Sequence, residues 1–356
     1  MKKTALVLGT GNWGTTLAHL LAEAGTSTIL WGRNKEIVHE INERHTNTKS
    51  AKNLKISPAV RAATELGEAA SSAELIFIAV PSQVFREVSC QLGNFVRGDQ
   101  LLISCTKGIE TKSSKLMTGI LMDETCCKKV GALSGPNIAA EIIHGDPSGA
   151  VIASAYQEVI EKVMMALQQP LFKVYGNKDV KGVEIGGALK NIIAIASGMA
   201  AGLGFENNSR AFLITRGILE ISRYGAFFGA NPETFLGLSG IGDLIATCYS
   251  AHSRNNTFGR LIASGKKMEE VLKEIRMVVE GIYATEAVYR LSQKFNIFMP
   301  ITAGVYRLIF EGEGIQDVIR DLMTVRTKYE GEEDRRRLSD IQHMLINKYP
   351  IPEYRL

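Results

Sequence analysis

The first half of the chain alternates short apolar runs with stretches of helical periodicity. The runs carry apolar side chains at successive positions, which is typical of strands in a mostly parallel sheet covered on both faces. The predicted strands are residues 5–8, 28–31, 74–80, 100–105, 129–133, 148–153 and 172–175. Beyond residue 179 helical periodicity takes over. The pattern predicts an α/β fold class, with a doubly wound domain over residues 1–179 and an all-α domain over residues 180–356.

A glycine-rich turn follows the first predicted strand. Gly9, Gly11 and Gly14 have the spacing G-x-G-x-x-G, and a predicted helix at residues 15–24 and the strand at 28–31 complete a βαβ unit. In units that bind dinucleotides, the first glycine permits the tight turn and the second lets the backbone approach a pyrophosphate. The third lets the helix lie close to the strand. The pyrophosphate would lie at the positive end of that helix. We therefore predict a dinucleotide site, with an ordinary loop as the alternative.

The end of the second predicted strand refines the choice of cofactor. An NAD-only site would place a carboxylate there for the ribose hydroxyls, but the chain continues from Trp31 through Gly32 to Arg33 without an acid. The planar guanidinium of Arg33 suits a 2′-phosphate. We expect NADP to be accepted, with NAD also possible. A solvated arginine at a strand end is the alternative.

Composition narrows the class of protein. The 356 residues are 45% hydrophobic and 22% charged with a net charge of +4, as in an ordinary globular enzyme, and no basic run with interleaved aromatics suggests nucleic-acid binding. The five cysteines form no CxxC pair, so we expect reduced thiols, no metal site and a cytoplasmic location. No signal peptide is apparent, and residues 192–205 predict a buried helix instead of a membrane span. Residues 330–337 predict a solvated helix start, with a partner patch as the alternative.

Lys190 is the strongest candidate for chemistry in the second half. It lies in a predicted helix with little polar surface. Burial of an ammonium is costly without a partner and lowers its pKa, which suits proton exchange with a carbonyl or alcohol near neutral pH. A lysine that extends to water is the alternative.

Two further segments could bind an anion or assist proton transfer. Asp243 follows a glycine-rich turn and could alternatively cap the next helix. Ser253, Arg254 and Asn255 open another predicted helix, where N–H groups and a guanidinium could hold a phosphate, with plain capping as the alternative. Together with a dinucleotide fold, these segments suggest reduction of a small phosphorylated carbonyl compound.

The chain resembles the soluble NAD(P)-dependent sn-glycerol-3-phosphate dehydrogenases over residues 3–330. The resemblance rests on six motifs, at residues 9–14, 106–110, 134–139, 187–191, 237–243 and 253–255. It implies an N-terminal Rossmann domain, a C-terminal helical domain and an active site between them. It also implies reversible reduction of dihydroxyacetone phosphate to sn-glycerol 3-phosphate, which supplies phospholipid synthesis, in a cytoplasmic homodimer.

The resemblance also implies roles for individual residues. Lys190 would be the general acid/base at the C2 oxygen, assisted by Lys107 and Asp243. The substrate would contact Lys107, Gly135, Asn137, Lys190, Asp243, Ser253, Arg254 and Asn255. The cofactor would contact Gly9, Gly11, Asn12, Trp13, Gly14, Arg33, Lys107, Ala139, Arg254, Val278 and Glu280. The chain departs from the family at Asn137, where Ser or Thr is usual, and in a longer tail beyond about residue 335.

Two rival functions remain open at this point. A β-hydroxyacid dehydrogenase also combines a Rossmann domain with a helical lysine, but the segment Ser253-Arg254-Asn255 and the turn before Asp243 argue against it. A non-enzymatic NADP sensor would bind cofactor without turning it over, and fold alone does not decide between the two classes.

Overall fold

The computed structural model describes residues 4–52 and 54–324, which divide into two compact units. Among the described residues, the first unit comprises residues 4–52, 54–110 and 115–184, and the second comprises residues 111–114 and 185–324. The chain thus passes between the units in the 110–115 loop and inside the helix that contains Glu184 and Ile185. The predicted helix start at residues 330–337 and the tail beyond residue 335 lie outside the described residues.

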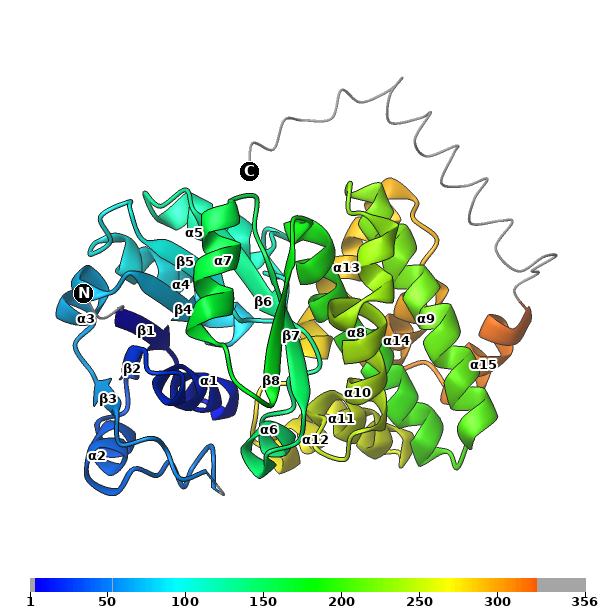
Figure 1. Ribbon diagram of the computed structural model, residues 1–356. Helices are drawn as coiled ribbons and strands as arrows, with labels where there is room; N and C mark the ends of the chain where they lie inside the picture. Colours follow the sequence, from blue (N-terminus) through cyan, green and yellow to red (C-terminus); the bar gives the residue numbers. More distant parts are fainter. Residues whose placement is uncertain (1–3, 53, 325–356) are drawn as a thin grey trace. The chain divides into compact units, whose positions relative to one another are not determined.

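The first unit is built on one eight-stranded sheet (Figure 1). Its strands are β1 (Thr4–Leu8), β2 (Ser27–Trp31), β3 (Val60–Ala63), β4 (Leu75–Ile78), β5 (Leu101–Ser104), β6 (Val130–Ser134), β7 (Ser148–Ala153) and β8 (Phe172–Asn177). Their spatial order is β3-β2-β1-β4-β5-β6-β7-β8, and every neighbouring pair is parallel except β6–β7. The first six strands have the order of a Rossmann fold. This confirms the predicted mostly parallel, doubly wound sheet.

Helices cover both faces of this sheet. They are α1 (Asn12–Glu23), α2 (Lys35–Arg44), α3 (Leu66–Ser72), α4 (Ser82–Gly93), α5 (Met117–Glu124), α6 (Ala139–His144) and α7 (Gln157–Ala166). Alternate residues of β1 point to opposite faces: Ala5 and Val7 pack with α1, α2 and α7, whereas Leu6 and Leu8 pack with α3, α4 and α5. Both faces are dry, which explains why the strands are apolar at every position.

The second unit is helical in its described part (Figure 1). Its elements are α8 (Val180–Gly202), α9 (Asn207–Phe227), η1 (Pro232–Leu236), η2 (Leu238–Gly242), α10 (Asp243–Tyr249), α11 (Arg254–Ala263), α12 (Met268–Ile275), α13 (Glu280–Phe295), α14 (Pro300–Tyr306), η3 (Arg307–Glu311) and α15 (Ile315–Thr324). Among the described helices, α8 alone is long and apolar enough to cross a membrane, yet 78% of its most apolar stretch is buried inside the protein. That burial is the pattern of a core helix, as predicted for residues 192–205.

Close helix packing around α8 depends on glycine residues, which have no side chain. A Cβ added to Gly198 of α8 would lie 2.1 Å from the carbonyl oxygen of Asn256, and one added to Gly259 of α11 would lie 2.1 Å from that of Ile195. These distances are too short for any side chain. The two glycines therefore let α11 lie directly on α8, which sets the position of the polar residues described next.

Candidate active site

The glycine-rich turn joins β1 to α1 as the sequence predicts. Gly9 has a φ of +117°, and a Cβ there would lie 2.7 Å from the carbonyl oxygen of Ala79. A Cβ on Gly14 would lie 2.0 Å from the carbonyl oxygen of Gly9, so only glycine lets the helix start so close to the turn. Space remains beside Gly11, where an added Cβ would meet nothing within 4 Å. The turn therefore leaves its second glycine open to a ligand.

The start of α1 also presents polar groups that the described protein does not satisfy. Gly11 is the N-cap and makes no side-chain cap bond. The Asn12 Oδ1 and Trp13 Nε1 atoms are buried and have no hydrogen-bond partner among the described residues. A buried polar atom of this kind normally has a partner. The turn, the helix N-terminus and these two atoms fit a dinucleotide.

Arg33 follows β2 at the same edge of the sheet. Its side chain is 60% exposed and lies 3.4 Å from the carboxylate of Glu87, which is itself 56% exposed. An ion pair between exposed side chains contributes little. The guanidinium can therefore leave Glu87 for a stronger anion, and its selection of a 2′-phosphate stays a prediction.

A second group of predicted residues follows β5 and β6. The Lys107 ammonium donates a hydrogen bond of 2.6 Å to the Gly135 carbonyl oxygen. Gly135 has a φ of +131°, and an added Cβ would lie 3.0 Å from the backbone of Gly149. The Asn137 side chain donates to that same Gly149 oxygen at 3.1 Å, while its Oδ1 is buried without a partner in the described chain. Ala139 begins α6.

In the second unit, Lys190 is buried with a carboxylate. The residue is 6% exposed, so it does not extend to water, and its ammonium donates to Asp243 and, at 2.7 Å, to the Thr247 hydroxyl. Asp243 is 1% exposed and is the first residue of α10. It is not the N-cap of that helix, because Gly242 holds that position, which corrects the alternative considered from the sequence. The buried pair leaves each charge compensated, as burial requires.

Packing of the preceding turn on α8 brings Asp243 to Lys190. The turn contains η2, a π-helical segment, and a Cβ on Gly186 would lie 2.5 Å from the carbonyl oxygen of Ser239. Gly186 precedes Lys190 by one helical turn. Only glycine at that position lets the Gly237–Asp243 segment lie against α8, and π-helical turns are frequent at functional sites.

The predicted phosphate segment begins α11. The Ser253 hydroxyl accepts from the Asn256 N–H at 3.2 Å, which confirms the N-cap. Arg254 donates to the Val278 carbonyl oxygen at 2.9 Å, and its charge interacts with that of Glu280. Arg254, Val278 and Glu280, which the family resemblance assigned to the cofactor, lie together in the structure.

Asn255 is held by two other parts of the unit. Its Nδ2 donates to Asn191 Oδ1 at 2.8 Å, and its Oδ1 accepts from the Gly281 N–H at 3.0 Å. Asn255 thus joins α8 to the start of α13. Sequence reasoning assigned no role to Asn191 or Thr247. Thr247 follows Asp243 by four residues on one helix face, a spacing that could have indicated it.

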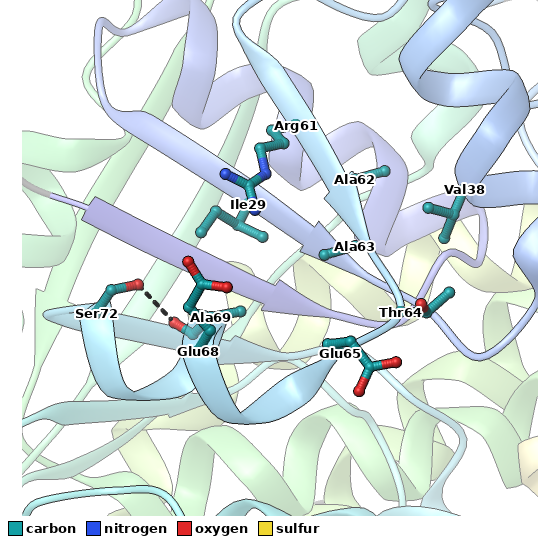
Figure 2. Close-up of a pocket in the computed structure, with 10 residues that line it drawn as sticks. All are labelled: Ile29, Val38, Arg61, Ala62, Ala63, Thr64, Glu65, Glu68, Ala69 and Ser72. Carbon is teal, nitrogen blue, oxygen red and sulfur yellow. Dashed lines mark hydrogen bonds between the residues drawn. The ribbon is translucent and has the colours of Figure 1, made fainter.

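Three other features of the described residues were considered as sites: possible metal ligands, the cysteines and a surface hollow. No group of three or more His, Cys, Asp or Glu side chains within residues 4–52 and 54–324 could hold a metal ion. The five cysteines are free thiols, and burial raises the pKa of Cys248 to about 12. A hollow of about 360 Å³ lies along the edge strand β3. Figure 2 shows residues that line it, among them Arg61 of β3, Glu68 of α3 and Glu65 between these two elements. None of the predicted site residues lines it.

Comparison with known proteins decides the family. The model for the N-terminus of NAD-dependent glycerol-3-phosphate dehydrogenase matches residues 4–160, and the model for its C-terminus matches residues 179–320. The chain belongs to this family. It is an oxidoreductase that uses NAD or NADP.

Individual members of the glycerol-3-phosphate dehydrogenase family are similar to this chain over most of its length and nearly all of theirs. A protein of Staphylococcus saprophyticus named glycerol-3-phosphate dehydrogenase [NAD(P)+] is 42% identical over 320 residues, which cover 89% of this chain and 96% of the relative. The crystal structure of glycerol-3-phosphate dehydrogenase from Coxiella burnetii has a TM-score of 0.86 at 34% identity and covers 91% of this chain and 99% of the other. The yeast enzyme has a TM-score of 0.80 at 28% identity, covering 90% and 99%.

Proposed function

We propose that this dehydrogenase reversibly reduces dihydroxyacetone phosphate to sn-glycerol 3-phosphate with NADPH or NADH, and so supplies phospholipid synthesis. The observation that carries the proposal is the buried Lys190 ammonium held by Asp243 and Thr247. A positioned lysine of this kind can serve as a general acid to a carbonyl oxygen. Membership of the glycerol-3-phosphate dehydrogenase family supports the choice of substrate.

The residues of the glycine-rich turn fit the cofactor. Gly9, Gly11 and Gly14 would admit the pyrophosphate, and the Asn12 and Trp13 side chains would supply polar contacts. Arg33 would meet the 2′-phosphate of NADP. Further contacts would come from residues implied by the family resemblance, namely Lys107, Ala139, Arg254, Val278 and Glu280. The bound nicotinamide supplies the hydride.

The protein's own part is control of charge at the substrate C2 oxygen. Lys190 donates a proton to that oxygen in the direction of reduction and removes it in the direction of oxidation. Asp243 holds the Lys190 ammonium in place, because the two side chains form a buried ion pair. The family resemblance implies that Lys107 would contribute a second positive charge, and preorganised charges stabilise a developing oxyanion. Gly135 and Asn137 would contact the substrate beside Lys107.

The substrate phosphate would bind at the start of α11. The first N–H groups of a helix lack intrahelical acceptors, and those of Arg254 and Asn255 are in this position. The Arg254 guanidinium adds charge. The Ser253 and Asn255 side chains already make cap and bridging bonds, so their support is partly indirect. Arg254→Ala should therefore raise KM for the phosphorylated substrate more than it lowers kcat. A change in kcat alone would argue against this role.

The test of the reaction is absorbance of reduced nicotinamide on addition of dihydroxyacetone phosphate. Oxidation of NADPH or NADH is expected, and the ratio of the two rates tests Arg33. If the protein binds NADPH but oxidises neither cofactor, it acts on another substrate or is a non-enzymatic sensor. We infer a cytoplasmic location from the free thiols and a homodimer from the family resemblance. Sedimentation of the full chain would test the homodimer.

A further inference from the structure

The carbonyl group at the centre of the glycine-rich turn is held by a residue outside the motif. The side chain of Asn47, which follows α2, donates from Nδ2 to the Thr10 carbonyl oxygen at 2.9 Å and to the Thr15 hydroxyl at 3.0 Å. Its Oδ1 accepts from the Ser50 N–H at 3.2 Å, which fixes the orientation of the amide. Asn47 is 0% exposed.

This contact determines the direction of the next N–H group. The Thr10 carbonyl and the Gly11 N–H belong to one planar trans peptide unit and point in opposite directions. Whatever fixes the carbonyl therefore fixes the N–H. Without such a restraint the unit could rotate, since the flanking Gly9 and Gly11 accept conformations that other residues do not.

The Thr10 side chain is restrained as well, by close packing. A Cβ added to Gly32, just after β2, would lie 2.4 Å from the Thr10 Cγ2 atom. Thr10 therefore packs against Gly32 while Asn47 holds its carbonyl from the loop after α2. The Gly11 side of the peptide unit is the open one.

We propose that Asn47 is a positioning residue for the dinucleotide turn: by holding the Thr10 carbonyl it aims the Gly11 N–H at the cofactor pyrophosphate. The proposal rests on the proposed dinucleotide site and does not depend on the identity of the reduced substrate. Asn47 itself does not contact the cofactor. Because NADP and NAD share the pyrophosphate, Asn47 supports both to the same degree, unlike Arg33.

A matched control lies in the same unit. Gln100 is 1% exposed, donates to the Ala70 and Ala73 carbonyl oxygens at 2.6 and 2.8 Å, and accepts from the Arg97 N–H at 2.8 Å. Its bonding thus resembles that of Asn47. It lies just before β5, at the amino end of a strand, whereas the glycine-rich turn follows the carboxyl end of β1.

The experiment measures Kd for NADPH and for NADH by titration calorimetry on the full chain. Asn47→Ala should raise both values by the same factor of about ten, since one buried hydrogen bond that fixes a ligand-binding group is lost. Gln100→Ala should leave both within about twofold, although both variants lower Tm. Asn47→Asp keeps the volume of the side chain but puts an acceptor opposite the Thr10 carbonyl, so it should raise both values further. It also provides the test should Asn47→Ala fail to fold.

Three results would overturn the inference. They are unchanged Kd values in both Asn47 variants, an equal rise in Gln100→Ala, or an effect confined to NADPH. Failure of the wild-type protein to bind either dinucleotide would instead contradict the dinucleotide site on which the inference rests. Normal binding of the dinucleotides without reduction of dihydroxyacetone phosphate would contradict the proposed reaction, and the role of Asn47 would still hold.

Discussion

Asp243 and Glu220 are two buried carboxylates of the helical unit that meet their partners in different ways. Asp243 is 1% exposed and binds side chains, the Lys190 ammonium and, at 3.3 Å, the Thr247 hydroxyl. Glu220 of α9 is 2% exposed and binds the start of α14. It accepts from the Ile301 and Thr302 N–H groups, both at 2.8 Å, and from the Thr302 hydroxyl at 2.6 Å.

The difference lies in what the partner can do. Backbone N–H groups at a helix start have fixed charge and position, so Glu220 stabilises α14 and supports no proton transfer. Burial raises the pKa of Glu220, and the α14 donors and Arg223 oppose that rise. A lysine, in contrast, can gain or lose a proton. Burial of a carboxylate therefore does not by itself indicate a catalytic function. The chemical nature of its hydrogen-bond partner does.

Replacement of Lys190 by Met should show most strongly how the Asp243–Lys190 pair differs from Glu220, because it should affect both turnover and stability. Loss of the general acid should lower kcat by about 10²–10⁴-fold. The Asp243 charge would remain buried without its cation, so the free energy of unfolding should also fall, by about 3–5 kcal/mol. Steady-state kinetics and thermal unfolding measure the two effects.

The double variant Lys190→Met with Asp243→Asn provides the control. Removal of both charges should recover much of the lost stability, because a buried pair contributes little against neutral groups of similar size. Turnover should stay low. Recovery of activity along with stability would show that Lys190 acts only through folding.

Glu220→Ala should give the reverse pattern, with a loss of stability and unchanged chemistry. Three buried donors would lose a charged acceptor, which should lower the free energy of unfolding by about 3–5 kcal/mol, and Glu220→Gln should lose less. Urea unfolding measures the change. Glu274→Gln is the comparison, since that side chain is 52% exposed and should change stability by less than about 0.5 kcal/mol. A fall in kcat of folded Glu220→Ala would contradict the structural role.

The sequence predicted those features of the fold and site that depend on residues close together in the chain. Glycine spacing predicted the turn between β1 and α1, and the apolar surroundings of Lys190 marked it as exceptional. The predicted helix at 15–24 nevertheless begins earlier, at Asn12, because the N-terminus of α1 lies within the glycine motif itself. The edge strand β3 was missed, since it has four residues and carries the exposed Arg61.

Local sequence patterns could not predict partners distant in the sequence, and only the family resemblance placed Asp243 with Lys190. Asp243 is separated from Lys190 by 53 positions, Asn47 from Thr10 by 37, and Glu220 from Thr302 by 82. No local pattern identifies which buried amide or carboxylate meets which donor. The motifs thus located candidate residues, whereas the bonds that hold them follow only from the packing of helices on the sheet and on α8.

Glu184 sharpens the comparison, because in the first unit it repeats the Glu220 arrangement, in which a buried carboxylate accepts hydrogen bonds from a helix start. It is 7% exposed and accepts from the Thr118 N–H at 2.9 Å and from the Thr118 hydroxyl, at the start of α5. Burial outweighs these bonds and raises its pKa to about 7 from 4.5. The folded state therefore binds a proton that the unfolded chain releases at lower pH.

The stability of the protein should depend on pH through this group. Its contribution should be complete below pH 4.5 and should decline as pH rises through about 7, by at most about 1.4 kcal/mol per pH unit. In urea unfolding between pH 5 and 8, the wild-type protein should lose stability relative to Glu184→Gln, whose side chain does not titrate, and the difference should level off above pH 7. A difference that is constant over this range would mean that the α5 donors offset the burial of Glu184 completely. In that case a buried carboxylate bound to a helix start would not by itself make stability depend on pH.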